Sequence, residues 1–296
     1  MKGSDTIAKS LGYKVFSIFN VTFMGLLLII CLYPFIYMLA LSFSGTKAVL
    51  AGRVFLYPVD FTISTYKTIF NYPNFFVAYR NTIFYTAAGS TISLFMTITF
   101  AYPLTKSFLK GRNTVIKFVI FSMFFSGGMI PNFLLVSWLH LTDTVFAMLL
   151  PFAINQFNLI ILMNFLKTLP ESIEEAAIID GMSYFGILYK IIVPLSKPAI
   201  ATIALYMAVF FWNDWFYGMI YMSSSQRYPV MLFLRNIASG ASIRGAASGS
   251  GTADKNTIYI TLKSGAIILT TLPIIILYPF LQRYFITGLT VGSVKG

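Results

Sequence analysis

Carboxylates are rare in this 296-residue chain, yet four of its nine acidic residues fall within ten positions. They are Glu171, Glu174, Glu175 and Asp180, and the sequence has no other glutamate. Long apolar runs lie on both sides of this segment, which is itself polar and rich in helix-forming residues. An acidic segment of predicted helix therefore connects two long apolar stretches of the kind that cross membranes.

Local signals predict two short helices in this connection. Thr168 and Ser172 each stand three residues before a glutamate, a spacing typical of a capping box at a helix start. Gly181 favours a helix end because glycine adopts the left-handed backbone easily. A second helix is predicted from about 184 to 192, and Pro194 is expected to follow its end.

The spacing of this segment matches a known pattern. Glu175-Ala176-Ala177, three residues, Gly181, nine residues and Ile191-x-Val193-Pro194 resemble the EAA loop of bacterial ABC importer permeases, with Val193 in place of leucine. The resemblance implies a coupling helix that docks into a groove on an ATPase subunit. It assigns this role to Glu174, Glu175, Ala176, Ala177, Asp180, Gly181 and Pro194. The alternative is an ordinary amphipathic cytosolic loop.

Composition places the rest of the chain in a membrane. Apolar residues make up 57% of the sequence, charged residues 10%, and the mean hydropathy is +0.79. An average soluble domain has about 25% charged residues. The net charge of +12 is scattered over loops without a basic stripe, which favours anionic lipid headgroups over nucleic acid.

Six uncharged or nearly uncharged runs are long enough to cross a bilayer, which takes about 20 residues. The prediction is an all-α, six-transmembrane-helix permease of the MetI-like type. Small residues at 87–90 predict a close helix contact. Residues 1–14 would be a cytosolic N-terminus, 15–286 the membrane domain with the coupling loop at 168–198, and 287–296 a cytosolic tail. The spans are expected within Val15–Leu41, Asn81–Thr105, Phe118–Leu139, Thr144–Leu166, Pro198–Met222 and Ser264–Gln282.

The sequence has no catalytic signature of its own. None of its Lys-Ser or Lys-Thr pairs follows a glycine, so it lacks a phosphate-binding P-loop. It also lacks His/Cys spacings typical of a metal site. We therefore expect no enzyme activity, catalytic residue, metal or cofactor in this chain, with ATP and Mg²⁺ bound by partner subunits.

Polar residues inside apolar runs are candidates for a substrate pathway, since ionisable groups at membrane depth are costly. Trp212-Asn213-Asp214-Trp215 resembles the Trp-Asn-(Asp/Glu) element of sugar permeases, and its alternative is an interfacial aromatic belt. The segment 126–132 predicts either a helix interruption or a plain kink. The amides of the fourth span either line the pathway or bond between helices. The pathway candidates are Trp212, Asn213, Asp214, Trp215, Asn155, Asn158, Gly127 and Gly128.

The last residues, from Tyr278 onward, resemble the C-terminus of maltose-type permeases. That resemblance implies that the tail contacts the ATPases through Gly292, Lys295 and Gly296; a frayed tail is the alternative. The family implies a second homologous permease, two ATPase subunits, an extracellular solute-binding protein, and a place in the bacterial cytoplasmic membrane with both termini in the cytosol.

The substrate is predicted more coarsely than the family. The sequence looks most like permeases for polysaccharide fragments of the aldouronate or alginate type. Some of the basic residues of the predicted outer segment are expected to attract an acidic oligosaccharide; they are Arg227, Arg235, Arg244, Lys255 and Lys263. Three alternatives remain open. They are an importer of another solute such as a peptide, a secondary transporter, and a membrane protein with a structural or sensory role.

Overall fold

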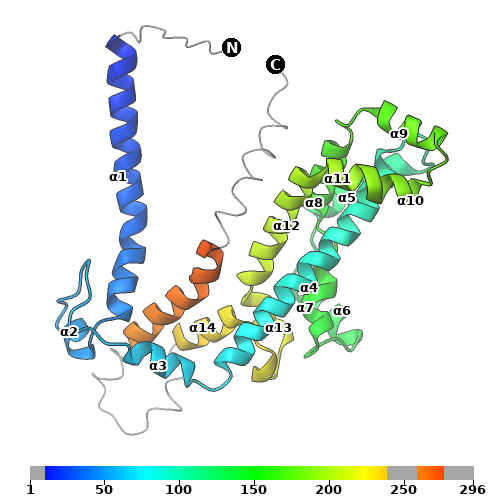
Figure 1. Ribbon diagram of the computed structural model, residues 1–296. Helices are drawn as coiled ribbons and strands as arrows, with labels where there is room; N and C mark the ends of the chain where they lie inside the picture. Colours follow the sequence, from blue (N-terminus) through cyan, green and yellow to red (C-terminus); the bar gives the residue numbers. More distant parts are fainter. Residues whose placement is uncertain (1–10, 239–258, 277–296) are drawn as a thin grey trace. The chain divides into compact units, whose positions relative to one another are not determined.

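The computed structural model describes residues 11–238 and 259–276, and every regular element in that part of the chain is a helix (Figure 1). The predicted all-α class is therefore confirmed. The chain forms two compact units. The first combines residues 1–71 with 237–269, and the second combines 72–236 with 270–296.

The first unit is built around α1 (Leu11–Ser42), followed by α2 (Thr46–Leu50) and α3 (Ser64–Phe70). The apolar stretch Gly12–Ser42 has 31 residues and rises about 46 Å, more than the roughly 30 Å of a bilayer core. Its side chains are largely exposed in the isolated chain. They are therefore available to lipid or to another subunit.

The second unit contains the remaining labelled helices, although the end of α14 passes into the first unit. They are α4 (Phe75–Ala101), α5 (Arg112–Phe124), α6 (Met129–Trp138), α7 (Val145–Leu149), α8 (Gln156–Leu166), α9 (Glu171–Ile179), α10 (Tyr184–Ile187), α11 (Val193–Leu195), α12 (Lys197–Trp212), α13 (Phe216–Tyr221) and α14 (Val230–Ala238).

Three predicted spans correspond to single helices. The first lies within α1, and the second lies within the continuous segment Phe75–Thr105. The sixth begins before its predicted start at Ser264, because the described segment Tyr259–Ile276 is already helical. The predicted continuation to Gln282 lies outside the described residues, as do the tail and residues 1–10 of the predicted N-terminal segment, whose last four residues belong to α1.

The other three predicted ranges each contain a break, and an interruption was expected only in the third span. The chain bends by 115° between α5 and α6, and by 46° between the helical segment Val145–Phe152 and α8. Helix α12 ends at Trp212 instead of continuing to Met222. With bent pairs counted as single spans, up to six crossings remain among the described residues.

The break between α5 and α6 has a local cause. Gly128 has φ +90° and ψ 174°, a backbone that a side chain disfavours, and its N–H donates to Ser126 Oγ at 3.3 Å. The expected helix interruption is confirmed over the alternative of a plain kink. Hydrophobicity alone does not reveal such a break, because both arms remain apolar.

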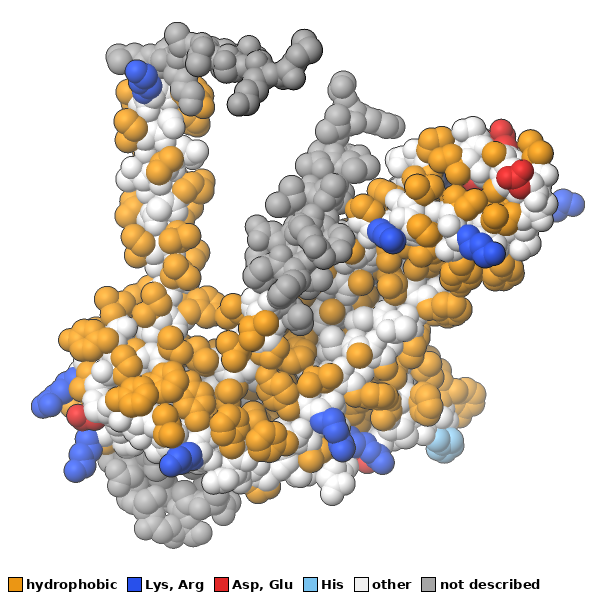
Figure 2. Space-filling view, in the orientation of Figure 1, with side chains coloured by type: hydrophobic (Ala, Val, Ile, Leu, Met, Phe, Trp, Pro, Cys, Tyr) orange, Lys and Arg blue, Asp and Glu red, His pale blue; other side chains and the backbone are white. Residues whose placement is uncertain are grey.

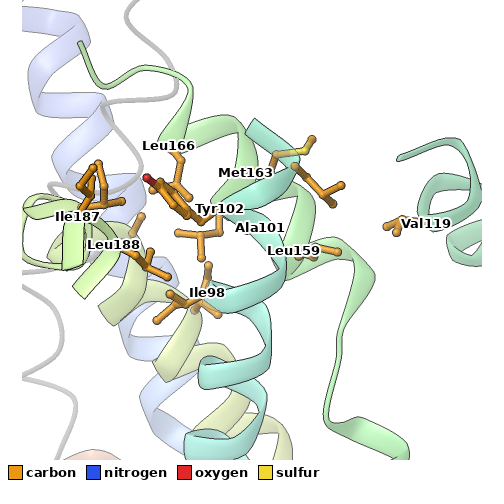
Figure 3. Packing of buried hydrophobic residues seen from close by; sticks show 14 of the residues in the cluster. Ile98, Ala101, Tyr102, Val119, Leu159, Met163, Leu166, Ile187 and Leu188 are labelled. Atoms are coloured by element: carbon orange, nitrogen blue, oxygen red, sulfur yellow. The ribbon is translucent and has the colours of Figure 1, made fainter. Parts of the chain in front are cut away.

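Two apolar clusters organise the second unit. The first joins the ends of α4 and α8 to α10, and Figure 3 shows Tyr102, Leu166, Ile187 and Leu188 close together there. The second surrounds Phe211 of α12 with residues of α4 and α7. Helix α4 contributes to both clusters, so it connects the coupling loop to the α12 contact.

Apolar side chains cover much of the visible surface (Figure 2). Phe124 and Trp138, for example, are 85% and 78% exposed. A surface of this kind is normal where the solvent is lipid or where a second chain packs. Acidic side chains, by contrast, gather at the α9 end of the second unit.

Candidate functional sites: the coupling loop and an aromatic cavity

Helix α9 forms the first half of the coupling loop, and it begins at Glu171 without either predicted capping box. Pro170 is the N-cap residue in an extended backbone. Thr168 Oγ1 donates to the Phe165 carbonyl at 2.7 Å, and Ser172 lies inside the helix. The Thr168 box failed because Pro170 restricts Leu169, the residue before it, to extended backbone, so Leu169 cannot be the first helical residue. The Ser172 box failed because the helix has already begun at Glu171.

The predicted end of α9 at Gly181 is confirmed. Gly181 has φ +78°, and its N–H donates to the Ile178 carbonyl at 2.9 Å. The Met182 N–H donates to the Ala177 carbonyl at 3.0 Å. This pair of bonds is the Schellman motif, which satisfies the last carbonyls of a helix and reverses the chain.

The two faces of α9 differ. Ala177 is buried in the apolar cluster beneath the loop, whereas Glu175, Ala176 and Asp180 are exposed. Glu174 turns inward, where its Oε2 forms an ion pair with Lys106 Nζ. The outer face of α9 therefore presents a carboxylate beside a small residue, a surface that another protein can approach closely.

The second helix of the loop extends further than predicted. It continues from Tyr184 through a π turn at Leu188–Ile192 to Leu195, and it includes Pro194. The widened turn explains this correction. Proline clashes with the carbonyl four residues earlier, and Lys190 occupies that position within the π turn. A bend of 83° then separates this helix from α12.

The Trp-Asn-Asp-Trp element follows the end of α12, and its residues face different surroundings. Trp212 is buried, and its Nε1 donates to the Thr270 carbonyl at 3.0 Å. Asn213 is exposed and donates to the Val209 carbonyl at 2.9 Å. The Arg235 guanidinium carbon lies 4.4 Å from the Trp215 ring centroid. The element therefore does not form a single surface.

Asp214 is buried and caps α13. Its Oδ1 accepts from the Tyr217 N–H at 3.1 Å, and its Oδ2 accepts from the Gly218 N–H at 3.0 Å. Carboxylates at helix starts satisfy N–H groups that have no partner within the helix. The side chain that the sequence assigned to the pathway thus has a structural task.

Replacing Asp214 with alanine is expected to destabilise the folded subunit by about 1–2 kcal/mol, because two N–H groups of α13 lose their acceptor. The measurement is the thermal unfolding midpoint of the detergent-solubilised protein. Asn213→Ala is the matched control, because its side chain is exposed. A midpoint for Asp214→Ala that equals the control's would refute the capping role.

A cavity of about 510 Å³ lies between α8, α12 and the start of α13. Both predicted amides reach it. Asn155 Oδ1 caps α8 by accepting from the Asn158 N–H at 3.0 Å, and Asn158 Nδ2 contacts Met207 Sδ at 3.2 Å. The lining residues are Pro151, Phe152, Ile154, Asn155, Gln156, Phe157, Asn158, Tyr206, Met207, Phe210 and Tyr217.

Aromatic rings form much of the cavity wall. The ring centroids of Phe152 and Tyr217 are 4.4 Å apart, and those of Phe152 and Phe210 are 5.1 Å apart. The site prediction did not include Tyr206, Phe210 and Tyr217. The four-residue spacing of Tyr206 and Phe210 places them on one face of α12 and was the available signal. Gly127 and Gly128 do not line this cavity.

Asp143 fixes another segment of the second unit. It accepts from the N–H groups of Ser224 at 3.0 Å and Ser223 at 3.2 Å, and it pairs with Arg227 at 2.9 Å. The Ser224 bond, followed by the Ser223 bond and Arg227, lowers the pKa of this carboxyl despite some desolvation. Its stabilising contribution is present above the ordinary carboxyl pKa and is lost as the pH falls through the lowered value.

Taken together, broken apolar helices, an exposed coupling loop and an aromatic cavity between helices define the membrane subunit of a transporter. The chain is 44% identical to "Protein LplC" of Bacillus subtilis (strain 168) over 284 residues, 96% of each chain. It is 39% identical to the "Polygalacturonan/rhamnogalacturonan transport system permease protein YtcP" of the same strain, over 96% of this chain and 99% of that one.

A solved structure of similar fold also belongs to a transporter. It comes from a bacterial ABC transporter involved in the import of the acidic polysaccharide alginate. The two chains share 35% identity and a TM-score of 0.84, over 93% of this chain and 98% of the other. No protein-family model matches the sequence. The chain belongs to the family of carbohydrate ABC transporter permeases.

Proposed function

We propose that the protein is one of two permease subunits in a binding-protein-dependent importer of oligosaccharides. The observation that carries this proposal is the folded EAA loop, with Glu175 exposed on α9. Two partner ATPases would bind ATP and Mg²⁺ and displace this loop. The membrane helices would then alternate between outward and inward access. A second permease and an extracellular binding protein complete the assembly.

The proposed location is the bacterial cytoplasmic membrane, with both termini in the cytosol. Apolar helices long enough to cross a bilayer support a multi-pass arrangement. The EAA loop supports the orientation, because the ATPases that it would contact work on the cytosolic side. The loop lies between α8 and α12, so these two helices would enter the membrane from the cytosol.

The cavity supports a sugar substrate. Aromatic faces pack against sugar rings, while amide groups exchange hydrogen bonds with hydroxyls, and the wall contains both kinds of side chain. One related chain belongs to a transport system for polygalacturonan and rhamnogalacturonan, and another to a transporter involved in the import of alginate. The wall has no charged residue. We therefore propose that it contacts the rings and hydroxyls of an oligosaccharide rather than its carboxylates.

The surroundings of Arg227 and Arg235 weaken the hypothesis that these side chains attract an acidic substrate. The ion pair with Asp143 compensates the charge of Arg227, and Arg235 lies over Trp215. Arg244 falls outside the described residues. Selection of an acidic substrate would therefore depend on the binding protein or the second permease more than on these two arginines.

Tyr206→Ala is expected to reduce oligosaccharide uptake about tenfold, since loss of one aromatic contact costs up to about 1.5 kcal/mol. Uptake is measured with oligosaccharides from polygalacturonate, alginate and a neutral glucan. The uncharged wall predicts similar reductions for every substrate that wild type carries. Val209→Ala, on the same helix and equally exposed, is the control. Equal uptake by the two variants would remove the cavity from the pathway.

The assembly is tested by purifying the detergent-solubilised subunit and identifying the proteins that accompany it by mass. A P-loop ATPase and a second six-span permease are expected. Recovery of this chain alone, or as a homodimer, under gentle conditions would favour a secondary transporter. The co-purified complex can then be reconstituted and its ATP hydrolysis measured with and without binding protein.

A further inference from the structure

A three-residue cluster joins the coupling loop to the end of α4. Glu174 Oε2 pairs with Lys106 Nζ, and the Tyr102 hydroxyl donates to the same oxygen at 3.3 Å. Lys106 Nζ also lies 4.4 Å from the centroid of the Tyr102 ring. Each member contacts both others, so the three side chains form a closed set.

The cluster is largely shielded from water. The side chains of Lys106 and Glu174 are only 16% and 18% exposed, and Tyr102 is buried. Ion pairs at exposed positions contribute little, whereas removal of one partner from a shielded pair leaves the other charge uncompensated. This geometry therefore resists separation of its two sides more strongly than a surface ion pair does.

The residues belong to different elements. Glu174 lies on α9, Tyr102 directly follows α4, and Lys106 follows the short 3₁₀ turn at Pro103–Thr105. Ala177, one turn after Glu174, is buried in the same apolar cluster as Tyr102. Two neighbouring contacts, one polar and one apolar, thus hold α9 against the end of α4.

Helix α4 continues from this contact to the cavity region. At Gly89 its backbone approaches the ring of Phe211 on α12 so closely that an added Cβ would lie 2.4 Å from it. Helix α12 also carries Tyr206 of the cavity wall. A displacement of α9 that moved α4 would therefore reach the cavity through two direct contacts.

We propose that the Tyr102–Lys106–Glu174 cluster makes α9 and α4 move as one body, so that it transmits loop movement toward the cavity. This role rests on the proposed function as an ATP-driven permease. It assigns Glu174 a task distinct from that of Glu175, which faces outward. Tyr102 and Lys106 become positioning residues outside the EAA motif.

Spin labels test the rigid connection without a known substrate. The exposed residues Phe95 on α4 and Ile179 on α9 are replaced by labelled cysteines in a Cys31→Ser background. In the co-purified complex, the interlabel distance is expected to be the same without nucleotide and with ATP and vanadate. The Glu174→Gln variant should broaden the distribution and make it nucleotide-dependent. A distance that changes with nucleotide in the parent complex would overturn the proposal.

Charge exchange provides the functional test. Lys106→Glu and Glu174→Lys should each lower the amount of alginate or polygalacturonate oligosaccharide transported per ATP hydrolysed at least fivefold. The double variant, which restores an opposite pair, should recover most of that ratio. Lys110→Gln, in the same connection but exposed, is the control and should match wild type. Failure of the double variant to recover, despite wild-type assembly, would contradict the cluster's role.

The two levels of the proposal fail differently. A complex that lacks ATPase subunits would refute the proposed function itself. A complex that assembles and couples ATP to uptake, yet tolerates Glu174→Gln with unchanged spin-label distances, would refute only the cluster. The ratio of transport to hydrolysis separates positioning from stability, because unfolding removes both activities together.

Discussion

Glu175→Lys is expected to weaken ATPase binding roughly a hundredfold, about 2.8 kcal/mol, and to abolish uptake while the subunit remains folded. Glu175 is exposed on α9, beyond the first turn, so a lysine there disturbs neither the core nor the helix start. The loss arises because a positive charge meets a partner surface built for a carboxylate. ATPase recovery on the purified subunit and oligosaccharide uptake measure the two effects.

Glu171→Lys is the matched control, since it makes the same charge change four residues earlier on α9 and outside the Glu-Ala-Ala motif. It should cost up to about 1 kcal/mol of helix stability through the helix dipole. ATPase binding should nevertheless stay within about threefold of wild type. An assembled Glu175→Lys complex with normal substrate-stimulated hydrolysis would show that α9 does not couple through this residue.

Gly89→Ala is expected to destabilise the folded subunit by about 1–3 kcal/mol, because its new methyl group overlaps the Phe211 ring. Ring atoms lie 2.4, 2.5 and 2.7 Å from the position of that methyl group. Phe211 is 2% exposed, and its ring packs against Phe210 at 5.3 Å and Phe152 at 6.2 Å. The ring has no free space, so α4 and α12 must separate. The thermal midpoint in detergent reports the loss.

Gly25→Ala controls for the chemistry of the substitution. Gly25 also lies inside a long apolar helix, but no atom is within 4 Å of its added Cβ. Alanine is the better helix former by up to about 1 kcal/mol, so this variant should match or exceed wild-type stability. The combination Gly89→Ala with Phe211→Leu should recover part of the loss. Equal midpoints for Gly25→Ala and Gly89→Ala would contradict the close contact.

Local sequence signals were reliable where one residue type has few alternatives. Gly181 ends α9 with φ +78°, as glycine after a helix predicts, and the small residues at 87–90 predict the contact that Gly89 makes. The capping boxes predicted at Thr168 and Ser172 did not form, because a neighbouring proline is the stronger local signal. Pro170 stands between them and determines where the helix begins.

The roles of polar residues in the apolar runs were harder to predict. Asp214 is an ionisable residue in an apolar run, as expected of a pathway residue, yet it caps α13. Asn155 and Asn158, by contrast, line the cavity. A buried polar group needs a hydrogen-bond partner, and the sequence does not indicate whether that partner is a substrate or a nearby backbone. Tyr206 and Tyr217 were missed because aromatic residues are common throughout this chain.

The membrane class, the all-α fold and the family could be predicted from the sequence, because hydropathy and the spacing of the EAA loop are properties of consecutive residues. The fold was needed to show where the spans break, that Glu174 faces Lys106 while Glu175 faces outward, and which side chains line the cavity. These features depend on contacts between α4, α8, α9 and α12, which are distant along the chain. Periodicity within one segment carries no information about what packs against it.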